Sequence, residues 1–166
     1  MHGYYKVDRP DDLRGAVAGL AAGLLASLVM TGFQAGVAKL IPDISGGGDD
    51  EPATEQAADK VSEAAVGQPV PEDRKAVAGE VVHYAFGALL GAGYGIAGEH
   101  GDLLKSGGGT VFGASAALLF DDIAVPALGL SPPASETPAK THAYAIASHL
   151  VFGLVLEGAR RALRGR

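Results

Sequence analysis

Long uncharged segments alternate with short polar ones along this chain of 166 residues. The clearest uncharged segment is residues 15–38, which contain no charged side chain. About 20 such residues are enough for a helix to cross a bilayer, and this segment lacks the polar face of a soluble amphipathic helix. No basic region with a short apolar core precedes it, so we interpret it as a membrane helix and not as a cleaved signal. We therefore predict a transmembrane helix over residues 15–40.

Three further apolar segments follow, over residues 76–98, 107–130 and 139–157. Each of them contains ionisable side chains, which are costly in lipid and which therefore point toward other helices when they occur. The pattern predicts an all-α integral membrane bundle of four transmembrane helices, with residues 1–166 forming a single membrane domain.

The first polar break, residues 42–75, is acidic and has Gly and Pro near its edges. Within it, small and apolar residues recur at the spacing of one helical face. These residues are Ala57, Val61, Ala64 and Ala65. We predict a short amphipathic surface helix in this loop, outside the bilayer or lying on it.

The basic residues indicate the orientation, because cytoplasmic loops carry more Lys and Arg than loops on the other side. With both termini inside, the inner side holds Lys6, Arg9, Arg14, Lys105, Arg160, Arg161, Arg164 and Arg166. The outer side then holds Lys39, Lys60, Arg74, Lys75 and Lys140. We expect a multi-pass protein of the inner (cytoplasmic) membrane, with both termini cytoplasmic and with the 42–75 loop periplasmic in a Gram-negative source.

The composition favours close helix packing, because the chain has 25 Gly, abundant Ala, no Trp and few aromatic residues. Small residues on one helix face let neighbouring backbones approach each other in lipid. Such residues recur every four positions in all four predicted spans. The glycines that we expect to pack are Gly15, Gly19, Gly23, Gly87, Gly91, Gly95, Gly113 and Gly153. They are suited to contacts within one chain or between the chains of a homo-oligomer.

Several function classes are not supported by the sequence. The net charge of −6 argues against binding to nucleic acid. The absence of Cys excludes a disulfide framework, a thiolate metal site and a Cys nucleophile. No GxSxG, HExxH or P-loop pattern is present, so we do not expect an enzyme. The partner that the sequence does indicate is the lipid bilayer.

Ionisable residues in the predicted spans form the candidate site. His83, Asp121, His149 and Glu157 fall on the small-residue faces of their own helices, so they are expected to point at other helices. With a helical rise of 1.5 Å per residue, the positions of most of the ionisable residues along the spans lie in the outer half of the bundle. The six residues expected there are Glu80, His83, Asp121, Asp122, His142 and His149. Glu157 lies alone near the inner surface, where Arg160 or Arg161 is at helical spacing for an ion pair.

Three chemistries are open for this cluster. Proton sensing or relay suits histidines next to carboxylates, because histidine titrates near neutral pH. A single Zn²⁺ or Fe²⁺ ion is a second possibility, with Glu80 and His83 on one helical face and with His149 and Asp121 or Asp122 as further ligands. A b-type haem between His83 and His149 is the third, with Gly87 and Gly153 leaving room for a flat ring.

Each chemistry corresponds to a different kind of protein. A metal or haem site implies a membrane subunit of a redox complex, assembled with other membrane or periplasmic proteins. If the polar groups only fix the register of the helices through hydrogen bonds, the chain is a structural assembly subunit.

A turn in the second half of the chain and the last span that follows it contain a distinctive set of residues. They are Leu128, Gly129, Leu130, Ser131, Pro132, Pro133, His149, Glu157, Arg160 and Arg161. In these positions the chain resembles the YagU-type inner-membrane proteins. A middle span, VVHYAFGALLGAGYG, is similar to that family's Gly-rich span, with His83, Gly87 and Tyr94 at comparable places.

This likeness covers about residues 81–166; Ser131 replaces a Thr of the family pattern, and the acidic 42–75 loop has no counterpart. The resemblance implies a small helical inner-membrane protein with a part in acid resistance and no established catalytic activity. That expectation agrees with proton handling.

Overall fold

The structure is a computed structural model, and it describes residues 10–42, 44 and 51–165. It is all-helical, and the described residues contain no strand. Three helical segments in the described chain are long and apolar enough to cross a membrane, namely Asp12–Leu40, Glu72–His100 and Ser106–Ala127.

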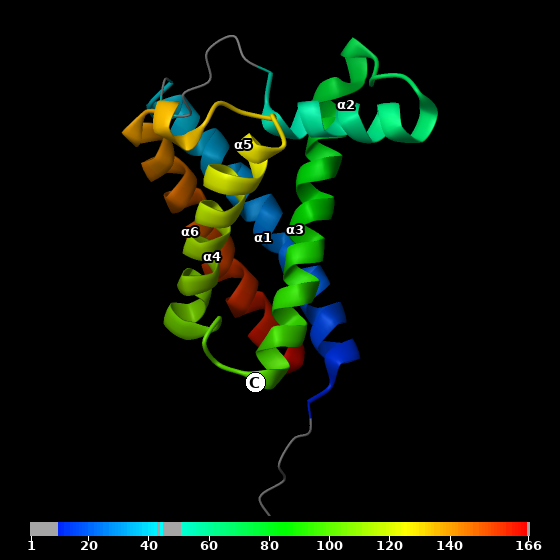
Figure 1. Cartoon of the computed structure of the whole chain (residues 1–166). Coiled ribbons are helices and arrows are strands. Elements are labelled where there is room, and N and C mark those ends of the chain that lie inside the picture. Colours follow the sequence, from blue (N-terminus) through cyan, green and yellow to red (C-terminus); the bar gives the residue numbers. More distant parts are fainter. Residues whose placement is uncertain (1–9, 43, 45–50, 166) are drawn as a thin grey trace, which may run out of the picture.

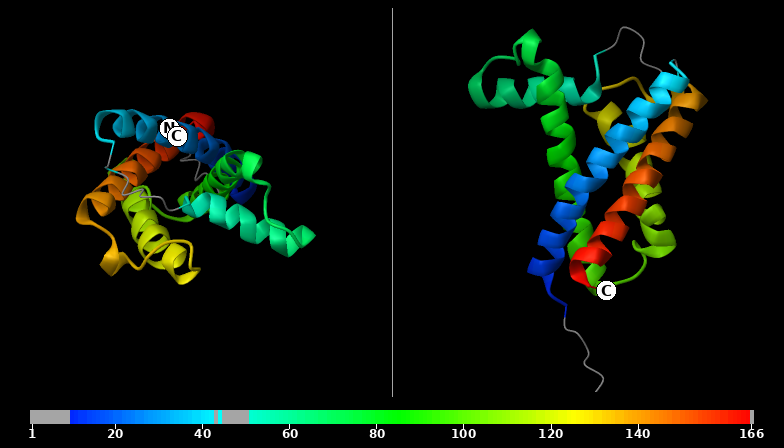
Figure 2. Two further views of the ribbon diagram at one scale, coloured as in Figure 1. Left: turned by 90° about the horizontal axis from the view of Figure 1, so that it is seen from above. Right: turned by 180° about the vertical axis from the view of Figure 1, so that it is seen from behind.

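The first two long helices are antiparallel neighbours. Helix α1 (Asp12–Leu40) begins at Asp11, whose side chain accepts a hydrogen bond from the backbone N–H of Arg14 and so caps the helix. Helix α3 (Lys75–His100) follows a 3-10 turn at Glu72–Arg74. Helix α1 packs against both α3 and α6 (Figures 1 and 2).

Helix α2 (Ala53–Val66) lies within the predicted outer loop and ends at Gly67, whose φ of 78° is readily adopted only by glycine. It lies across the end of α3 and projects from the bundle (Figure 1). The face that we predicted to be apolar contains Val61, Ala64 and Ala65, and all three are exposed. Ala58 is the buried residue of the helix. Residues 43 and 45–50 of the predicted loop lie outside the described part of the chain.

The third apolar segment is not one regular helix. It consists of a 3-10 turn (Ser106–Gly109), α4 (Thr110–Ala116), a π-helical stretch (Ala117–Ala124) and α5 (Val125–Ala127). Pro126 accounts for the irregularity, because it has no N–H and its ring would clash with the carbonyl group of Asp122 four residues earlier. The chain avoids that clash by widening the preceding turn, so that the N–H of Val125 bonds to the carbonyl oxygen of Phe120.

Helix α6 (Ala139–Arg164) is the last element and runs back along α1 and α4. A 3-10 turn (Ala134–Glu136) precedes it. Although α6 is long enough, it is not among the three segments apolar enough to span a membrane, because it carries histidines, Lys140, Glu157 and arginines. The described chain begins and finishes at one end of the bundle, which we call the C-terminal end. The opposite end, which carries α2, is the α2 end (Figure 1).

Glycines bring the helix backbones into direct contact. A Cβ atom added to Gly19 or Gly23 of α1 would overlap the carbonyl oxygen of Gly91 or Gly87 of α3. At Gly15 the corresponding distance, to the carbonyl oxygen of Gly95, would be 2.7 Å. Added Cβ atoms would also overlap backbone carbonyl oxygens where Gly113 faces His149 and where Gly153 faces Gly109. The six buried residues of the small core are Ala22, Ala26, Met30, Tyr94, Phe152 and Leu156.

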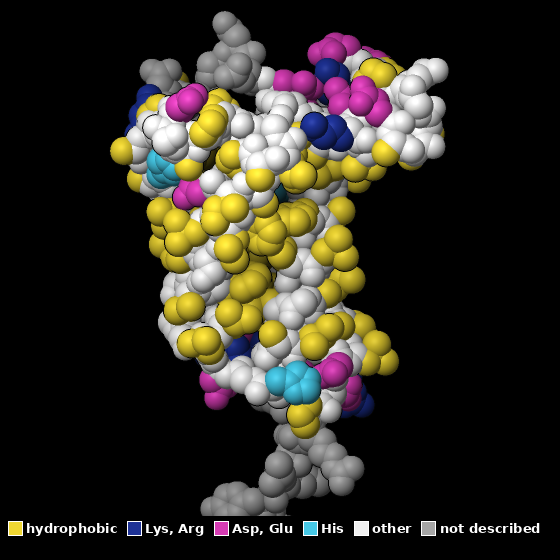
Figure 3. Space-filling model, viewed as in Figure 1, with side chains coloured by type: hydrophobic (Ala, Val, Ile, Leu, Met, Phe, Trp, Pro, Cys, Tyr) yellow, Lys and Arg dark blue, Asp and Glu magenta, His cyan; other side chains and the backbone are white. Residues whose placement is uncertain are grey.

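Apolar side chains dominate the middle of the visible face, and charged side chains lie toward both ends (Figure 3). Many large apolar residues of the described chain are exposed, including Leu24, Leu28 and Leu89. A soluble protein rarely exposes so much contiguous apolar surface, whereas a helical bundle in lipid is expected to do so. The structure therefore agrees with the coarse prediction of a helical membrane protein.

Candidate functional site

Two His–Asp pairs connect the π-helical stretch to α6. The Nδ1 atom of His142 lies 2.8 Å from Oδ1 of Asp122, and Nδ1 of His149 lies 3.3 Å from Oδ2 of Asp121. The two histidines are seven residues apart and so share one face of α6. The two carboxylates are consecutive in the chain, in the segment whose turn Pro126 widens. The structure thus brings together four of the six residues expected at the outer site.

His142 contacts oxygen atoms through both ring nitrogens. While Nδ1 faces the Asp122 carboxylate, Nε2 lies 3.0 Å from the carbonyl oxygen of Ala134 in the 3-10 turn before α6. A backbone carbonyl oxygen only accepts hydrogen bonds, so Nε2 must carry a proton. The Nδ1 contact then requires a second proton, either on Nδ1 or on Asp122. This arrangement therefore holds one proton more than a neutral imidazole beside an ionised carboxylate.

His149 has a different environment. Its Nδ1 atom lies 3.0 Å from the carbonyl oxygen of Ala145, in the preceding turn of α6, as well as near Asp121. One proton on Nδ1 satisfies both acceptors, so the neutral ring suffices here. His149 also makes no hydrogen bond to the segment before α6 among the described residues. The two pairs are thus chemically unequal, and only the one at His142 needs the extra proton.

Glu80 and His83 do not join these pairs. Glu80 is exposed on α3. His83 is partly buried, makes an edge contact with the ring of Tyr84, and has an Nε2 atom that is buried with no partner in the described structure. No hydrogen bond or ion pair among the described residues joins these two residues to the His–Asp pairs, so their place in the cluster of six stays a prediction. Residues three apart share a helix face, but that spacing does not say which other helix the face meets.

The described residues do not form the predicted metal cluster, because they contain no group of three or more His, Asp or Glu residues that could hold a metal ion. The room expected for a haem beside Gly87 and Gly153 is also occupied. An added Cβ atom at Gly87 would overlap Oγ of Ser27. One at Gly153 would overlap the carbonyl oxygen of Gly109. These glycines accommodate neighbouring helices instead of a ring.

A second polar cluster lies at the C-terminal end, around Glu157. This carboxylate is 1% exposed and accepts hydrogen bonds from the Tyr94 hydroxyl at 2.9 Å and from Nε and Nη2 of Arg160 at 2.7 and 3.0 Å. Nε of Arg161 donates to it as well. The helical spacing predicted an ion pair of Glu157 with Arg160 or Arg161, and in the structure Glu157 bonds to both.

Two further ion pairs lie beside Glu157. The guanidinium group of Arg164 donates two hydrogen bonds of 2.9 Å to the buried carboxylate of Glu99, which also accepts the backbone N–H of Asp11. Lys105 lies in the loop between the second and third apolar segments. Its Nζ atom contacts the carbonyl oxygen of Gly98 at 2.8 Å and the Asp102 carboxylate at 2.7 Å. The hydrogen bond from Lys105 holds the pKa of Asp102 below its ordinary value.

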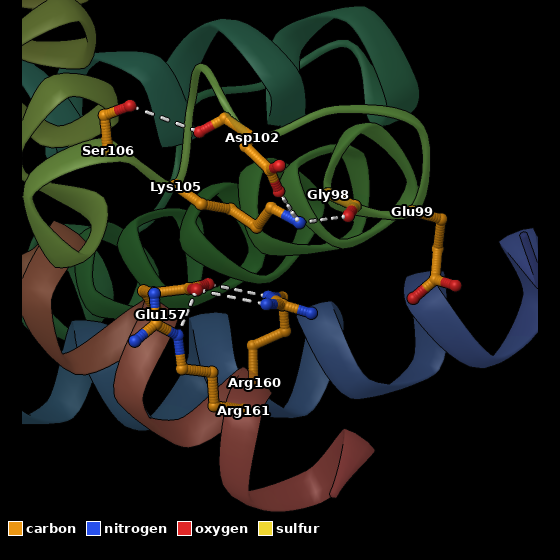
Figure 4. A pocket seen from close by; sticks show the side chains of 8 residues that line it. All are labelled: Gly98, Glu99, Asp102, Lys105, Ser106, Glu157, Arg160 and Arg161. Carbon is orange, nitrogen blue, oxygen red and sulfur yellow. Dashed lines mark hydrogen bonds and ion pairs between the residues drawn. The ribbon is translucent and has the colours of Figure 1, made fainter. Parts of the chain in front are cut away.

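An open cleft of about 510 Å³ lies between these groups, and we call it the C-terminal cleft. Asp102 and Lys105 stand on one side of it, facing Glu157, Arg160 and Arg161 of α6 across the opening (Figure 4). Its full lining is Gly98, Glu99, Asp102, Lys105, Ser106, Glu157, Arg160 and Arg161. Sequence reasoning missed this cleft, because residues 98–106 and 157–161 are far apart in the chain and no pattern links them.

The comparisons with known proteins identify a family. A family model described as "Protein of unknown function (DUF1440)" matches residues 52–158, and the chain belongs to that family. The match begins at the start of α2, so it covers part of the acidic loop, and it includes both His–Asp pairs. No curated protein and no solved structure matches the chain.

Proposed function

We propose that this member of the DUF1440 family is a four-span inner-membrane protein that senses protons at its outer end through Asp122 and His142. The observation that carries the proposal is the contact of both His142 ring nitrogens with oxygen acceptors. Histidine is the side chain that changes charge most readily in the physiological pH range, and without its second proton this arrangement loses one of its two hydrogen bonds. Asp122 is the charged group in contact with His142, and Asp121 is its neighbour in the chain.

The contacts of His142 explain how a proton would act on the fold. Asp122 belongs to the third apolar segment, Ala134 to the 3-10 turn, and His142 to the first turns of α6. The protonated ring therefore ties three elements together at the α2 end. We refer to this set of contacts as the His142 clamp. Loss of the proton removes one of the two contacts, so that His142 no longer holds both the third apolar segment and the 3-10 turn.

The polar side chains of α6 support its assignment as the fourth span. Ser148, Glu157 and Arg160 are buried, and His149 packs against the π-helical stretch. The exposed side of α6 includes Leu154. Polar residues in membrane helices normally face the interior of the bundle in this way.

The orientation with both termini inside is supported by the C-terminal end of α6. Arg160, Arg161 and Arg164 lie within its last two turns, at the end of the bundle that also holds Lys105 and the first turn of α1 with Arg14. Basic residues next to a span favour the cytoplasmic side. Lys6, Arg9 and Arg166, which were counted with them, lie outside the described residues. In this orientation α2 is on the outer side, and its exposed Val61 and Val66 suit contact with the bilayer surface.

The proton-sensing proposal agrees with the acid-resistance role implied by the YagU-type resemblance. A measurement of the distance between the 3-10 turn and the π-helical stretch tests it directly. Because the chain has no Cys, Ser135→Cys and Ile123→Cys, both at exposed positions, can carry spin labels in nanodiscs. We expect a narrow distance distribution at about pH 5 and a broader or longer one at about pH 8, on either side of the usual histidine range.

The control for this experiment is a second histidine. His142→Gln is expected to make the distance independent of pH, whereas His100→Gln, at the other end of the bundle, should leave the dependence intact. If the unmodified chain shows the same distribution at both pH values, the proposal is wrong.

A further inference from the structure

We infer that the C-terminal cleft binds a phosphate-bearing anion. The side chain of Arg161 is 55% exposed, whereas the Glu157 carboxylate that it contacts is 1% exposed. Within the described structure, the hydrogen bonds of Arg161 engage only its Nε atom. The two terminal nitrogens of its guanidinium group remain for a ligand, and the planar fork of this group is suited to phosphate oxygens.

The charges around the cleft leave a positive excess. Glu157 carries one negative charge and is bonded by two arginines, Arg160 and Arg161. Glu99 does not offset that excess, because it is paired with Arg164. A single anion placed next to Arg161 would therefore balance the group without removing a partner from Glu157.

Lys105 supplies a second cation on the opposite side of the cleft. Its partner Asp102 has a side chain that is 95% exposed, and an ion pair of that kind contributes little to stability. A phosphate group that enters the cleft can therefore replace Asp102 as the partner of Lys105. Lys105 keeps its hydrogen bond to the carbonyl oxygen of Gly98, which holds its side chain in place.

The surroundings favour a phosphate group carried by a lipid. Leu103 lies between Asp102 and Lys105 in the chain and is 77% exposed. The cleft lies at the C-terminal end, beyond the apolar band of the visible face (Figure 3). Basic pockets at the cytoplasmic ends of membrane helices bind the head groups of anionic lipids. This lipid assignment rests on the proposed membrane orientation, whereas binding of free phosphate does not.

The experiment compares two probes on the purified full chain in detergent. Native mass spectrometry measures the uptake of phosphatidylglycerol against zwitterionic phosphatidylcholine with the same acyl chains, and calorimetry measures the binding of inorganic phosphate. The test variants are Arg161→Gln and Lys105→Gln. The matched control is Arg74→Gln, which removes an exposed cation at the α2 end.

We expect the unmodified chain to prefer phosphatidylglycerol and Arg161→Gln to weaken that binding at least about tenfold, as for the loss of a hydrogen bond between charged groups. Lys105→Gln should weaken it too, and Arg74→Gln should not. Arg161→Gln is expected to fold, because Arg160 and Tyr94 still bond to Glu157, and its melting temperature checks this.

Binding of inorganic phosphate without a preference for phosphatidylglycerol would support the site and make free phosphate its ligand. The inference is overturned if neither probe binds, or if Arg74→Gln weakens binding as much as Arg161→Gln. Neither result would bear on the His142 clamp, which lies at the opposite end of the bundle.

Discussion

Gly19 and Gly91 are in backbone contact, because a Cβ atom on either residue would overlap the carbonyl oxygen of the other. The same relationship recurs one turn away between Gly15 and Gly95, and a Cβ atom added to Gly23 would overlap the carbonyl oxygen of Gly87. The interface of α1 and α3 therefore has no room for side chains at these glycines. Without a hydrophobic driving force between helices in lipid, such close approach is a main source of packing energy.

Gly91→Ala is therefore expected to destabilise the protein by about 1–3 kcal/mol, the usual cost of overpacking. Gly93→Ala is a matched control on the same helix, since a Cβ atom there meets nothing within 4 Å. It should be neutral or stabilising by up to about 1 kcal/mol, because alanine favours the helix more than glycine does. Unfolding in mixed detergent micelles measures both variants. Equal stabilities for the two would contradict the packing described here.

Asp122→Asn is expected to abolish the pH dependence of the distance between the spin labels at positions 135 and 123. The amide cannot become negatively charged, so it no longer stabilises the protonated ring of His142. Asp121→Asn should preserve the dependence, since His149 does not bond to the turn before α6 and keeps its contact with Ala145. The two variants remove neighbouring carboxylates of the same helix. Identical effects from both would show that the response is not specific to the clamp.

Glu157→Gln is expected to cost about 3–5 kcal/mol of stability, because it leaves the buried Arg160 without its countercharge. Tyr94→Phe should cost about 1 kcal/mol, since it removes one of several hydrogen bonds to the carboxylate. The unfolding free energy of each variant, measured in the same micelles, gives the comparison. A loss for Glu157→Gln no greater than that for Tyr94→Phe would mean that Arg160 has another partner.

Lys105→Gln is expected to raise the pKa of Asp102 toward its ordinary value, because Lys105 is the cause of its low pKa. In the unmodified chain this carboxyl group has a lower pKa in the folded than in the unfolded state. Its contribution to stability is therefore present above the unfolded-state pKa and is lost as the pH falls through the folded-state pKa. NMR titration of the Asp102 carboxyl carbon in both proteins tests this, and an unchanged pKa in the variant would contradict the pairing.

The helices and their small-residue faces could be predicted because both depend on local periodicity. Gly19 and Gly91 recur at four-residue spacing within their own segments, which identifies the face of each helix. The pairing of those faces, α1 with α3 and α4 with α6, depends on the tertiary arrangement and not on spacing. For the same reason, the spacing of Glu80 and His83 does not determine whether they meet the two His–Asp pairs, and the hydrogen bonds and ion pairs of the described residues do not link them to these pairs.

The irregular third segment was predicted as a continuous span, although the sequence holds a signal for its distortion. Pro126 lies four residues after Asp122, where its ring is incompatible with a regular helix. The widened turn before Pro126 affects the direction of the Asp121 and Asp122 side chains, which contact histidines of α6. The C-terminal cleft had no comparable signal, because it is formed by the loop after α3 and by a helix more than fifty residues further along the chain.

The backbone contacts at the glycines limit how this molecule can move. Helices α1 and α3 touch at successive turns, and so do the third apolar segment and α6, where Gly113 faces His149 and Gly153 faces Gly109. Tightly packed surfaces of this kind do not deform gradually, so each pair of helices is expected to move as one rigid unit. Any movement caused by protonation at His142 must then occur in residues 128–138, which link the third apolar segment to α6. In acid, the two pairs of helices would therefore keep their arrangement, and the connection before α6 would be the part of the protein that changes conformation.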